Sequence, residues 1–112
     1  MDNCIFCKII AGEIPSKKAY EDDKILAFHD IHPAAPVHIL VVPKIHLDSL
    51  NDINQENIDC VSHILLKIPE IAESFGVIDG YRVITNIGAK AGQSVKHLHF
   101  HILGGRKLGF LG

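Results

Sequence analysis

Three histidines near the end of the chain, His97, His99 and His101, alternate with apolar residues. Successive side chains of a β-strand point to opposite faces, so strict alternation predicts a half-buried strand over residues 94–103. On that strand the three imidazoles would share one face at a spacing of about 6.6 Å. The opposite face would enter the core through the residues between and after them, Leu98, Phe100 and Ile102.

Such a face could supply a base, an acid, a nucleophile or metal ligands, because the pKa of imidazole lies near neutrality. The alternative is a solvent-facing strand that uses histidine as an ordinary polar residue. Solvated strands usually carry Lys, Glu, Thr or Ser, and neighbouring charged histidines repel each other. We therefore expect a reactive or ligand-binding face.

The segment before this strand, residues 86–94, is small and polar and contains Gly88 and Gly92. Glycine lets a backbone approach a ligand closely and direct its N–H groups at an anion. Turns need glycine too, so the loop alone is weak evidence. Because it leads directly into the histidines, we interpret it as a second wall of a phosphate-binding site.

Cys4 and Cys7 form a C-x2-C pair near the N-terminus. Such a pair can be a redox dithiol, half of a metal site, or two small thiols in a packed helix. A redox role would favour a thioredoxin-like βαβ context, and the sequence lacks one. A metal site needs two further ligands, for which the histidines are candidates.

Residues 92–95 and 97–103 together resemble the signature of the histidine triad (HIT) hydrolases and transferases, in which an apolar residue follows each histidine. The continuation Gly-Gly-Arg at residues 104–106 resembles the Hint branch, the histidine triad nucleotide-binding proteins. The resemblance runs from residue 5 to residue 106, which is nearly the whole chain.

The resemblance implies a catalytic set. His99 would be the nucleophile that attacks an α-phosphate and forms a nucleotidyl-histidine, which water then cleaves. His101 and His38 would hold the non-bridging oxygens as charge develops, and Ser94 would help protonate a departing amine. His97 would act only indirectly. A capped core histidine remains the alternative for His38.

The resemblance also implies a nucleotide site. Asp30 would receive the two ribose hydroxyls, and Phe28 and Ile31 would flank the base. The alternative for Asp30 is a carboxylate that only caps the turn after its strand. The remaining expected contacts come from the loop and the histidines: Asn86, Gly92, Gln93, Ser94, Val95, His99 and His101.

Some bacterial-type HIT proteins carry an N-terminal C-x2-C pair together with a histidine after the Pro-Lys turn, as this chain does. The implied structural zinc site is of the Cys2His2 kind, and its ligands would be Cys4, Cys7, His46 and His97. No carboxylate cluster suited to Mg²⁺ is evident, so we expect no catalytic metal.

The implied activity is hydrolysis of purine nucleoside phosphoramidates at the P–N bond, acting on AMP or GMP conjugates. The alternatives are a dinucleoside polyphosphate hydrolase or nucleotidyl transferase on the same fold, and a nucleotide-binding protein without catalysis. The resemblance implies a homodimer that joins two sheets. The tail, residues 107–112, lacks the Trp-Pro-Pro ending of many Hint proteins, which leaves side-chain preference open.

Composition limits the other function classes. The chain has 112 residues, 47% of them hydrophobic, and a formal net charge of −2. We expect a single domain over residues 1–112 and no nucleic-acid groove, since there is no long basic run. No apolar run approaches the ~18 residues of a membrane span, and no signal peptide is evident. We expect a cytoplasmic protein with reduced cysteines.

The elements that must position these residues form an α+β fold, an antiparallel sheet of five strands packed on one long and one short helix. Strands are predicted over residues 18–21, 24–28, 38–43 and 81–86 besides the histidine strand. A short helix is predicted over residues 4–10.

The long helix is predicted over residues 54–75, capped by Asp52 or Asn54 and ended by Gly76. Pro69 should kink it or split it in two. The face predicted to be buried contains Ile58, Val61, Leu65, Ile68, Ala72 and Phe75.

Overall fold

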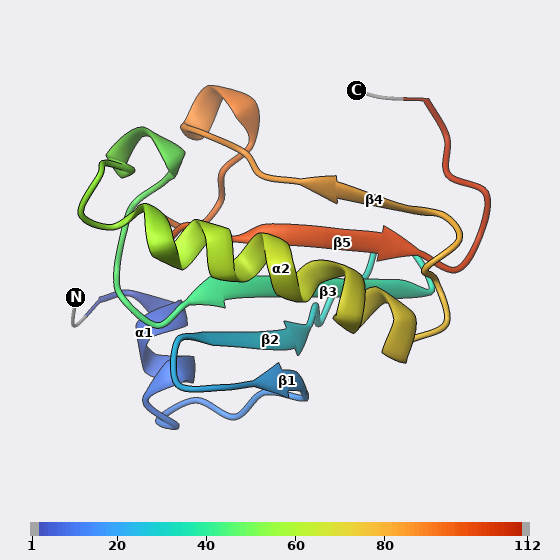
Figure 1. Cartoon of the computed structure of the whole chain (residues 1–112), viewed down its shortest axis with the longest axis horizontal. Coiled ribbons are helices and arrows are strands. Elements are labelled where there is room, and N and C mark those ends of the chain that lie inside the picture. The colour runs from blue at the N-terminus through green and yellow to red at the C-terminus, as the bar shows by residue number, and fades with distance from the viewer. Residues whose placement is uncertain (1–2, 111–112) are drawn as a thin grey trace.

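The protein is described by a computed structural model over residues 3–110. Its strands form one antiparallel sheet in the spatial order β1-β2-β3-β5-β4 (Figure 1). The predicted α+β class, five strands with one long and one short helix, is confirmed. The strands are β1 (Lys18–Glu21), β2 (Ile25–His29), β3 (Val37–Pro43), β4 (Tyr81–Ile84) and β5 (Phe100–Gly104).

The two helices cover opposite faces of the sheet. The long helix α2 (Ile58–Ser74) packs on the face that carries Ile39 and Val41 (Figure 1). The short helix α1 (Ile5–Ile10) packs on the other face, where Phe6 belongs to a cluster with Leu26, Phe28, Leu40 and Val42. Residues 38–43 are buried throughout because both faces of β3 are covered.

The histidine strand is shorter than predicted. It was expected over residues 94–103, but β5 begins only at Phe100. The alternation itself is confirmed for the apolar residues, since Leu98, Phe100 and Ile102 are all buried under α2.

β5 starts late because the backbone before Phe100 forms its hydrogen bonds with loop residues and not with β3. Pro43 would face Leu98 if the pairing of β3 with β5 continued, and proline has no N–H to donate. The Leu98 N–H instead donates to the Leu47 carbonyl, and the His99 carbonyl accepts from the Thr85 hydroxyl at 2.7 Å. Residues 97–99 are therefore held by loops rather than by a neighbouring strand.

The buried face of α2 differs in part from the predicted one. Ile58 and Leu65 are 41% and 54% exposed, so their assignment to the core is wrong. At about 100° per residue they lie roughly 70–90° from the centre of the apolar stripe, at its edge. The residues that α2 buries are Val61, Ile64, Ile68, Ile71 and Ala72.

The ends of α2 are also partly as predicted. Gly76 follows its C-terminal end with φ +77°, a conformation that glycine adopts without strain. The predicted caps are wrong: the N-cap residue is Asn57, and it makes no side-chain capping bond. The Asn54 side chain instead accepts hydrogen bonds from the Glu56 and Asn57 amides, one turn earlier.

Pro69 does not split α2, which is continuous over 17 residues. Proline removes the hydrogen bond to the carbonyl four residues earlier, here that of Leu65. Both residues are exposed, so water can solvate that carbonyl. Within residues 3–110 neither helix has the length and apolar composition needed to cross a bilayer.

Candidate active site and metal centre

A cavity of about 330 Å³ opens on the α1 side of the sheet. Its volume is in the range of small-molecule sites, and most of its lining is apolar. Two of the three alternating histidines, His99 and His101, reach it. The other predicted site residues that line it are Phe28, Asp30, Ile31, Ser94 and Val95.

His99 has a defined tautomer. Its Nδ1 lies 2.7 Å from the carbonyl oxygen of His97, and a carbonyl can only accept, so Nδ1 carries the proton. The lone pair of the neutral ring is therefore on Nε2, which has no hydrogen-bond partner among residues 3–110. The ring packs edge-on against Phe6 of α1 with centroids 5.1 Å apart and is only 4% exposed. Its ring is therefore oriented at a cavity wall, with the unprotonated nitrogen unpaired among the described residues.

The tautomers of His38 and His101 are also fixed, by a chain of hydrogen bonds that begins at a backbone N–H. The Ala34 N–H donates to Nδ1 of His38 at 3.0 Å, so a neutral His38 carries its proton on Nε2. That Nε2 donates to Nδ1 of His101 at 2.9 Å. His101 must then carry its own proton on Nε2, the nitrogen left free to donate to a ligand. The two rings are diagonal neighbours on β3 and β5, since His38 faces Leu103.

Both of these histidines are held neutral near pH 7. Burial lowers the pKa of His101 to about 4, and the neighbouring His99 and His38 add to the effect. Burial lowers the pKa of His38 in the same direction, partly opposed by the Asp30 charge. Only His101 keeps an Nε2–H free for a phosphate oxygen. His38 donates its Nε2–H to His101 and does not line the cavity, so the expected direct contact of His38 with a phosphate oxygen is not available in this arrangement.

Asp30 lies at the end of β2 beside these rings. One carboxylate oxygen accepts from the His32 N–H at 2.7 Å, which is the turn-capping contact considered as an alternative. The other lies 3.5 Å from Nε2 of His38. Its side chain is 21% exposed and borders the cavity, so capping leaves an oxygen available to a ligand.

Phe28 and Ile31 both line the cavity but differ in exposure. Phe28 is only 4% exposed, whereas Ile31 is 87% exposed and stands at the mouth.

Three predicted nucleotide contacts, Asn86, Gly92 and Gln93, do not line this cavity. Gln93 closes the loop instead: its side-chain oxygen accepts from the Gly88 N–H at 2.8 Å, and its amide nitrogen donates to the Asp48 and Val95 carbonyls. Gly92 ends a short 3-10 turn with φ +93°.

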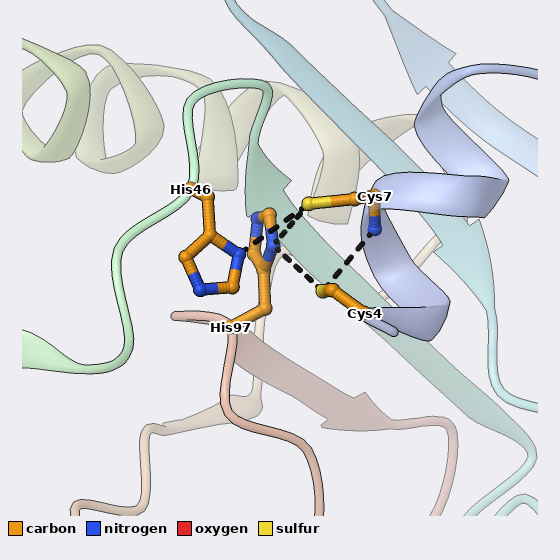
Figure 2. A group of neighbouring side chains, drawn as sticks. All are labelled: Cys4, Cys7, His46 and His97. Atoms are coloured by element: carbon orange, nitrogen blue, oxygen red, sulfur yellow. Dashed lines mark hydrogen bonds between the residues drawn. The ribbon is translucent and has the colours of Figure 1, made fainter. Parts of the chain in front are cut away.

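His97 does not line the cavity and is fully buried, so the expectation of three rings on one surface holds for only two. Its side chain belongs to a second group, with Cys4, Cys7 and His46 (Figure 2). Nδ1 of His97 lies 3.4 Å from Sγ of Cys4 and 3.5 Å from Sγ of Cys7. Nδ1 of His46 lies 3.3 Å from Sγ of Cys7. One potential ligand atom from each residue faces a common centre.

These distances fit a tetrahedral zinc ion. With Zn–S of about 2.3 Å and Zn–N of about 2.05 Å, the S···N edge of a tetrahedron is roughly 3.6 Å. The tautomers fit as well, because Nε2 of His97 donates to the Pro43 carbonyl at 2.9 Å and leaves Nδ1 with its lone pair. Nε2 of His46 lies 2.9 Å from the Asp48 carboxylate, a contact that typically orients zinc-binding histidines.

The thiols must lose their protons to bind a metal. Without one, burial and the neighbouring Cys4 raise the pKa of Cys7 to about 11, so its thiol is protonated. Metal binding at this group is therefore accompanied by proton release.

A second cluster, Asp30, His38 and His101, also brings possible ligand atoms within 4.8 Å of one another. Its hydrogen bonds make it a poor metal site. Nδ1 of His38 accepts from Ala34, so Nε2, the nitrogen that faces the other two residues, is protonated. In the Cys/His group the unprotonated Nδ1 of His97 faces the other possible ligands, whereas in this second cluster the protonated Nε2 of His38 faces them.

Some site residues carried no usable sequence signal. Phe6 borders the cavity because α1 lies over the sheet, and the N–H of Ala34 reaches His38 only through the fold of its loop. Asp48 follows His46 by two residues, and that spacing could have indicated a carboxylate partner.

Comparison with known proteins agrees with this geometry. A family model described as "scavenger mRNA decapping enzyme C-term binding" matches residues 3–109. Protein HitA of Neisseria gonorrhoeae is 50% identical over 104 residues, which cover 93% of this chain and 97% of HitA.

Solved structures resemble it closely as well. A histidine triad protein from Clostridium difficile is 58% identical with a TM-score of 0.93, and the match covers all of this chain and 97% of that one. A HIT family hydrolase from Clostridium thermocellum is 46% identical with a TM-score of 0.95, covering 99% and 97%.

The fold, the two cavity histidines and the Cys/His group define the class, which among the solved relatives is that of the HIT family hydrolases. The chain belongs to the histidine triad family, in the form with two N-terminal cysteines close to His46 and His97.

Proposed function

We propose that the protein hydrolyses the P–N bond of purine nucleoside phosphoramidates through a nucleotidyl-histidine intermediate. The observation that carries the proposal is the tautomer of His99, whose Nδ1–H is engaged by a carbonyl so that Nε2 keeps its lone pair at the cavity. A nucleophilic imidazole splits one difficult displacement at phosphorus into two easier ones.

In the first step Nε2 of His99 attacks the α-phosphorus, the P–N bond breaks, and the amine leaves with a proton. Ser94, at the exposed rim of the cavity, is suited to help deliver that proton. In the second step water cleaves the new P–N bond to release the nucleoside monophosphate and free His99. Nε2–H of His101 would stabilise a non-bridging oxygen in both steps, and His38 would support it.

The nucleoside part fits the apolar remainder of the cavity. Phe28 and Ile31 offer apolar surface to a base, and the Asp30 carboxylate can accept two hydroxyl hydrogen bonds from a ribose. We include Asn86, Gly92, Gln93 and Val95 in the proposal as residues that shape the loop near the phosphate, of which Val95 lines the cavity directly.

The experiment compares wild type and His99→Ala with an adenosine phosphoramidate and with diadenosine polyphosphates. We expect the phosphoramidate to be preferred by wild type. Turnover by His99→Ala should fall at least about 10³-fold, with nucleotide affinity kept within about tenfold. Single-turnover hydrolysis by His99→Ala at the wild-type rate would refute the nucleophile assignment.

The same assay separates the alternatives. Preference for diadenosine polyphosphates would favour a dinucleoside polyphosphate hydrolase, which needs the same histidine chemistry on another leaving group. Nucleotide binding with no turnover and no labelled nucleotide trapped on His99 would favour a binding protein.

We further propose that the Cys4, Cys7, His46 and His97 group holds a structural zinc ion and that the active site needs no catalytic metal. The zinc would fix α1 and the backbone of His97, so its influence on His99 is indirect.

We also propose a homodimer in which two sheets meet. The family resemblance suggests it, and β4 offers an edge strand on which Val83 is 40% exposed. Light scattering after size exclusion should give a mass of two chains. Val83→Asp should shift that mass towards one chain if β4 forms the contact.

A further inference from the structure

The Gly-Gly-Arg segment at residues 104–106 has no part in the proposed reaction, yet it packs tightly against the loop before β3. Gly105 has φ +94°, and a Cβ built on it would lie 2.9 Å from Cβ of Pro36. Only glycine combines that backbone conformation with so close an approach. The end of β5 and residues 34–36 are therefore fitted to each other.

Arg106 joins the same two segments by hydrogen bonds. One guanidinium nitrogen donates to the Ala34 carbonyl at 3.1 Å, and another donates to the Lys107 carbonyl at 3.0 Å. The other backbone group of Ala34, its N–H, donates to Nδ1 of His38. Ala34 thus connects an exposed arginine to a buried histidine.

The N–H of Ala34 determines which nitrogen of His38 carries the proton. If that N–H moved away, Nδ1 of His38 would be free to take the proton, and only the Asp30 carboxylate, 3.5 Å from Nε2, would still favour the Nε2–H form. In the Nδ1–H form, Nε2 of His38 would carry a lone pair. His101 would then have to donate to His38 through Nδ1–H, and its Nε2 would carry a lone pair. A lone pair repels a phosphate oxygen, where an N–H would attract it.

We propose that Gly105 and Arg106 are positioning residues that hold the Ala34 amide on His38 and thereby keep Nε2–H of His101 directed to the ligand. Neither residue touches the cavity. The effect on turnover rests on the proposed function, whereas the effect on the ring tautomers does not.

The test uses the full chain with its metal bound and ¹⁵N-labelled histidine. In wild type at pH 7, NMR shifts of the ring nitrogens should show Nε2–H tautomers for His38 and His101. In Arg106→Met and in Gly105→Ala we expect a mixture of tautomers at both rings. His97 and His99 serve as internal references, since backbone carbonyls hold their protons.

Matched variants isolate the contact. Arg82→Met removes another arginine that donates to a backbone carbonyl, that of Gly109, and it should leave every tautomer unchanged. Arg106→Lys keeps one donor and should restore part of the Nε2–H population. Phosphoramidate turnover by Arg106→Met should fall about tenfold, the loss expected for one well-oriented hydrogen bond.

Unchanged His38 and His101 tautomers in both Arg106→Met and Gly105→Ala would overturn the proposal. So would an equal change in Arg82→Met. Altered tautomers in a protein whose wild type hydrolyses no phosphoramidate would support the positioning role while refuting the proposed function.

Discussion

His97 serves two groups at once. Its side chain faces the two cysteine sulfurs, and its carbonyl oxygen accepts the Nδ1–H of His99. A residue expected to share a face with His99 and His101 therefore connects the Cys/His group to His99, the proposed nucleophile. The tautomer of His99 depends on the position of that carbonyl, which the proposed zinc ion would hold in place through the His97 side chain.

Replacing Cys7 tests the metal group at the scale of one residue. Cys7→Ser should purify with less than about half of the wild-type zinc, because a hydroxyl is a much poorer zinc ligand than a thiolate. Metal content would be measured by mass spectrometry of the purified protein. Cys60→Ser is the matched control, since Cys60 lies on α2 outside the group, and it should keep its zinc. Full zinc in Cys7→Ser would show that the metal binds elsewhere.

The sequence predicted the placement of side chains better than it predicted backbone hydrogen bonds. Alternation placed His99 and His101 together, and both line the cavity, while the C-x2-C spacing indicated two members of the Cys/His group. Ala34 could not be found in the same way, because it acts through an N–H whose direction depends on the loop. The carbonyl of His97 was missed for the same reason.

At the scale of elements, α2 stabilises the sheet through a narrow apolar stripe. Ile64 is fully buried, whereas Leu66, two residues on, is 70% exposed. Ile64→Ala should reduce the free energy of unfolding by about 2–5 kcal/mol through lost burial and the cavity left behind. Leu66→Ala should change it by less than about 0.5 kcal/mol. Urea unfolding of both variants gives the comparison, and similar losses would contradict the observed helix orientation.

The turn between β1 and β2 is tied to α2 by Asp22. Burial would raise the pKa of Asp22, but hydrogen bonds from His63, the Lys24 and Ile25 amides and the Tyr20 hydroxyl hold it well below its usual range. The folded carboxyl titrates below the unfolded one, whose pKa is about 3.9. The stabilisation is therefore complete above that pH and is lost as the pH falls towards the lower folded pKa.

Asp22→Asn should accordingly cost about 1–3 kcal/mol of unfolding free energy at pH 7 and less at pH 3.5. Urea unfolding at the two pH values measures both numbers. Asp23→Asn, at the exposed next position, should behave like wild type. An equal loss at both pH values would mean that the charge of Asp22 is not what stabilises the turn.

The ends of helices and strands were predicted correctly where the local sequence determines them. They were predicted wrongly where contacts with other elements determine them. Strands β1, β2 and β3 begin and end within one residue of the predicted ranges. The start of β5 depends on Pro43 in another strand, and the buried face of α2 depends on how the helix lies on the sheet. Neither the start of β5 nor the buried face of α2 can be deduced from the neighbouring residues in the sequence.

At the scale of the whole molecule, the Cys/His group, our proposed zinc site, joins α1 to the loops that carry His46 and His97. Helix α1 has only six residues, and isolated helices shorter than about 12 residues are marginal in water. A cavity of about 370 Å³ bordered by Cys4 and His46 gives a chelator access. Removal of the metal should therefore release α1 first.

Incubation with 1,10-phenanthroline should lower the melting temperature by about 10 °C or more, as expected for losing a tightly bound ligand of the folded state. Limited proteolysis should then cut faster within residues 3–17 than within α2. Added zinc should reverse both effects, measured by scanning calorimetry and mass spectrometry. Identical melting with and without chelator would contradict a stabilising metal.

The short helix also has a consequence for how this molecule can change over time. Phe6 lines the cavity and its neighbour Cys7 belongs to the proposed zinc site, so thermal stability and ligand preference would be coupled through two adjacent positions. Substitutions that change ligand preference should consequently be rare in α1. They should occur more often at the exposed rim of the cavity, around Ile31 and His32.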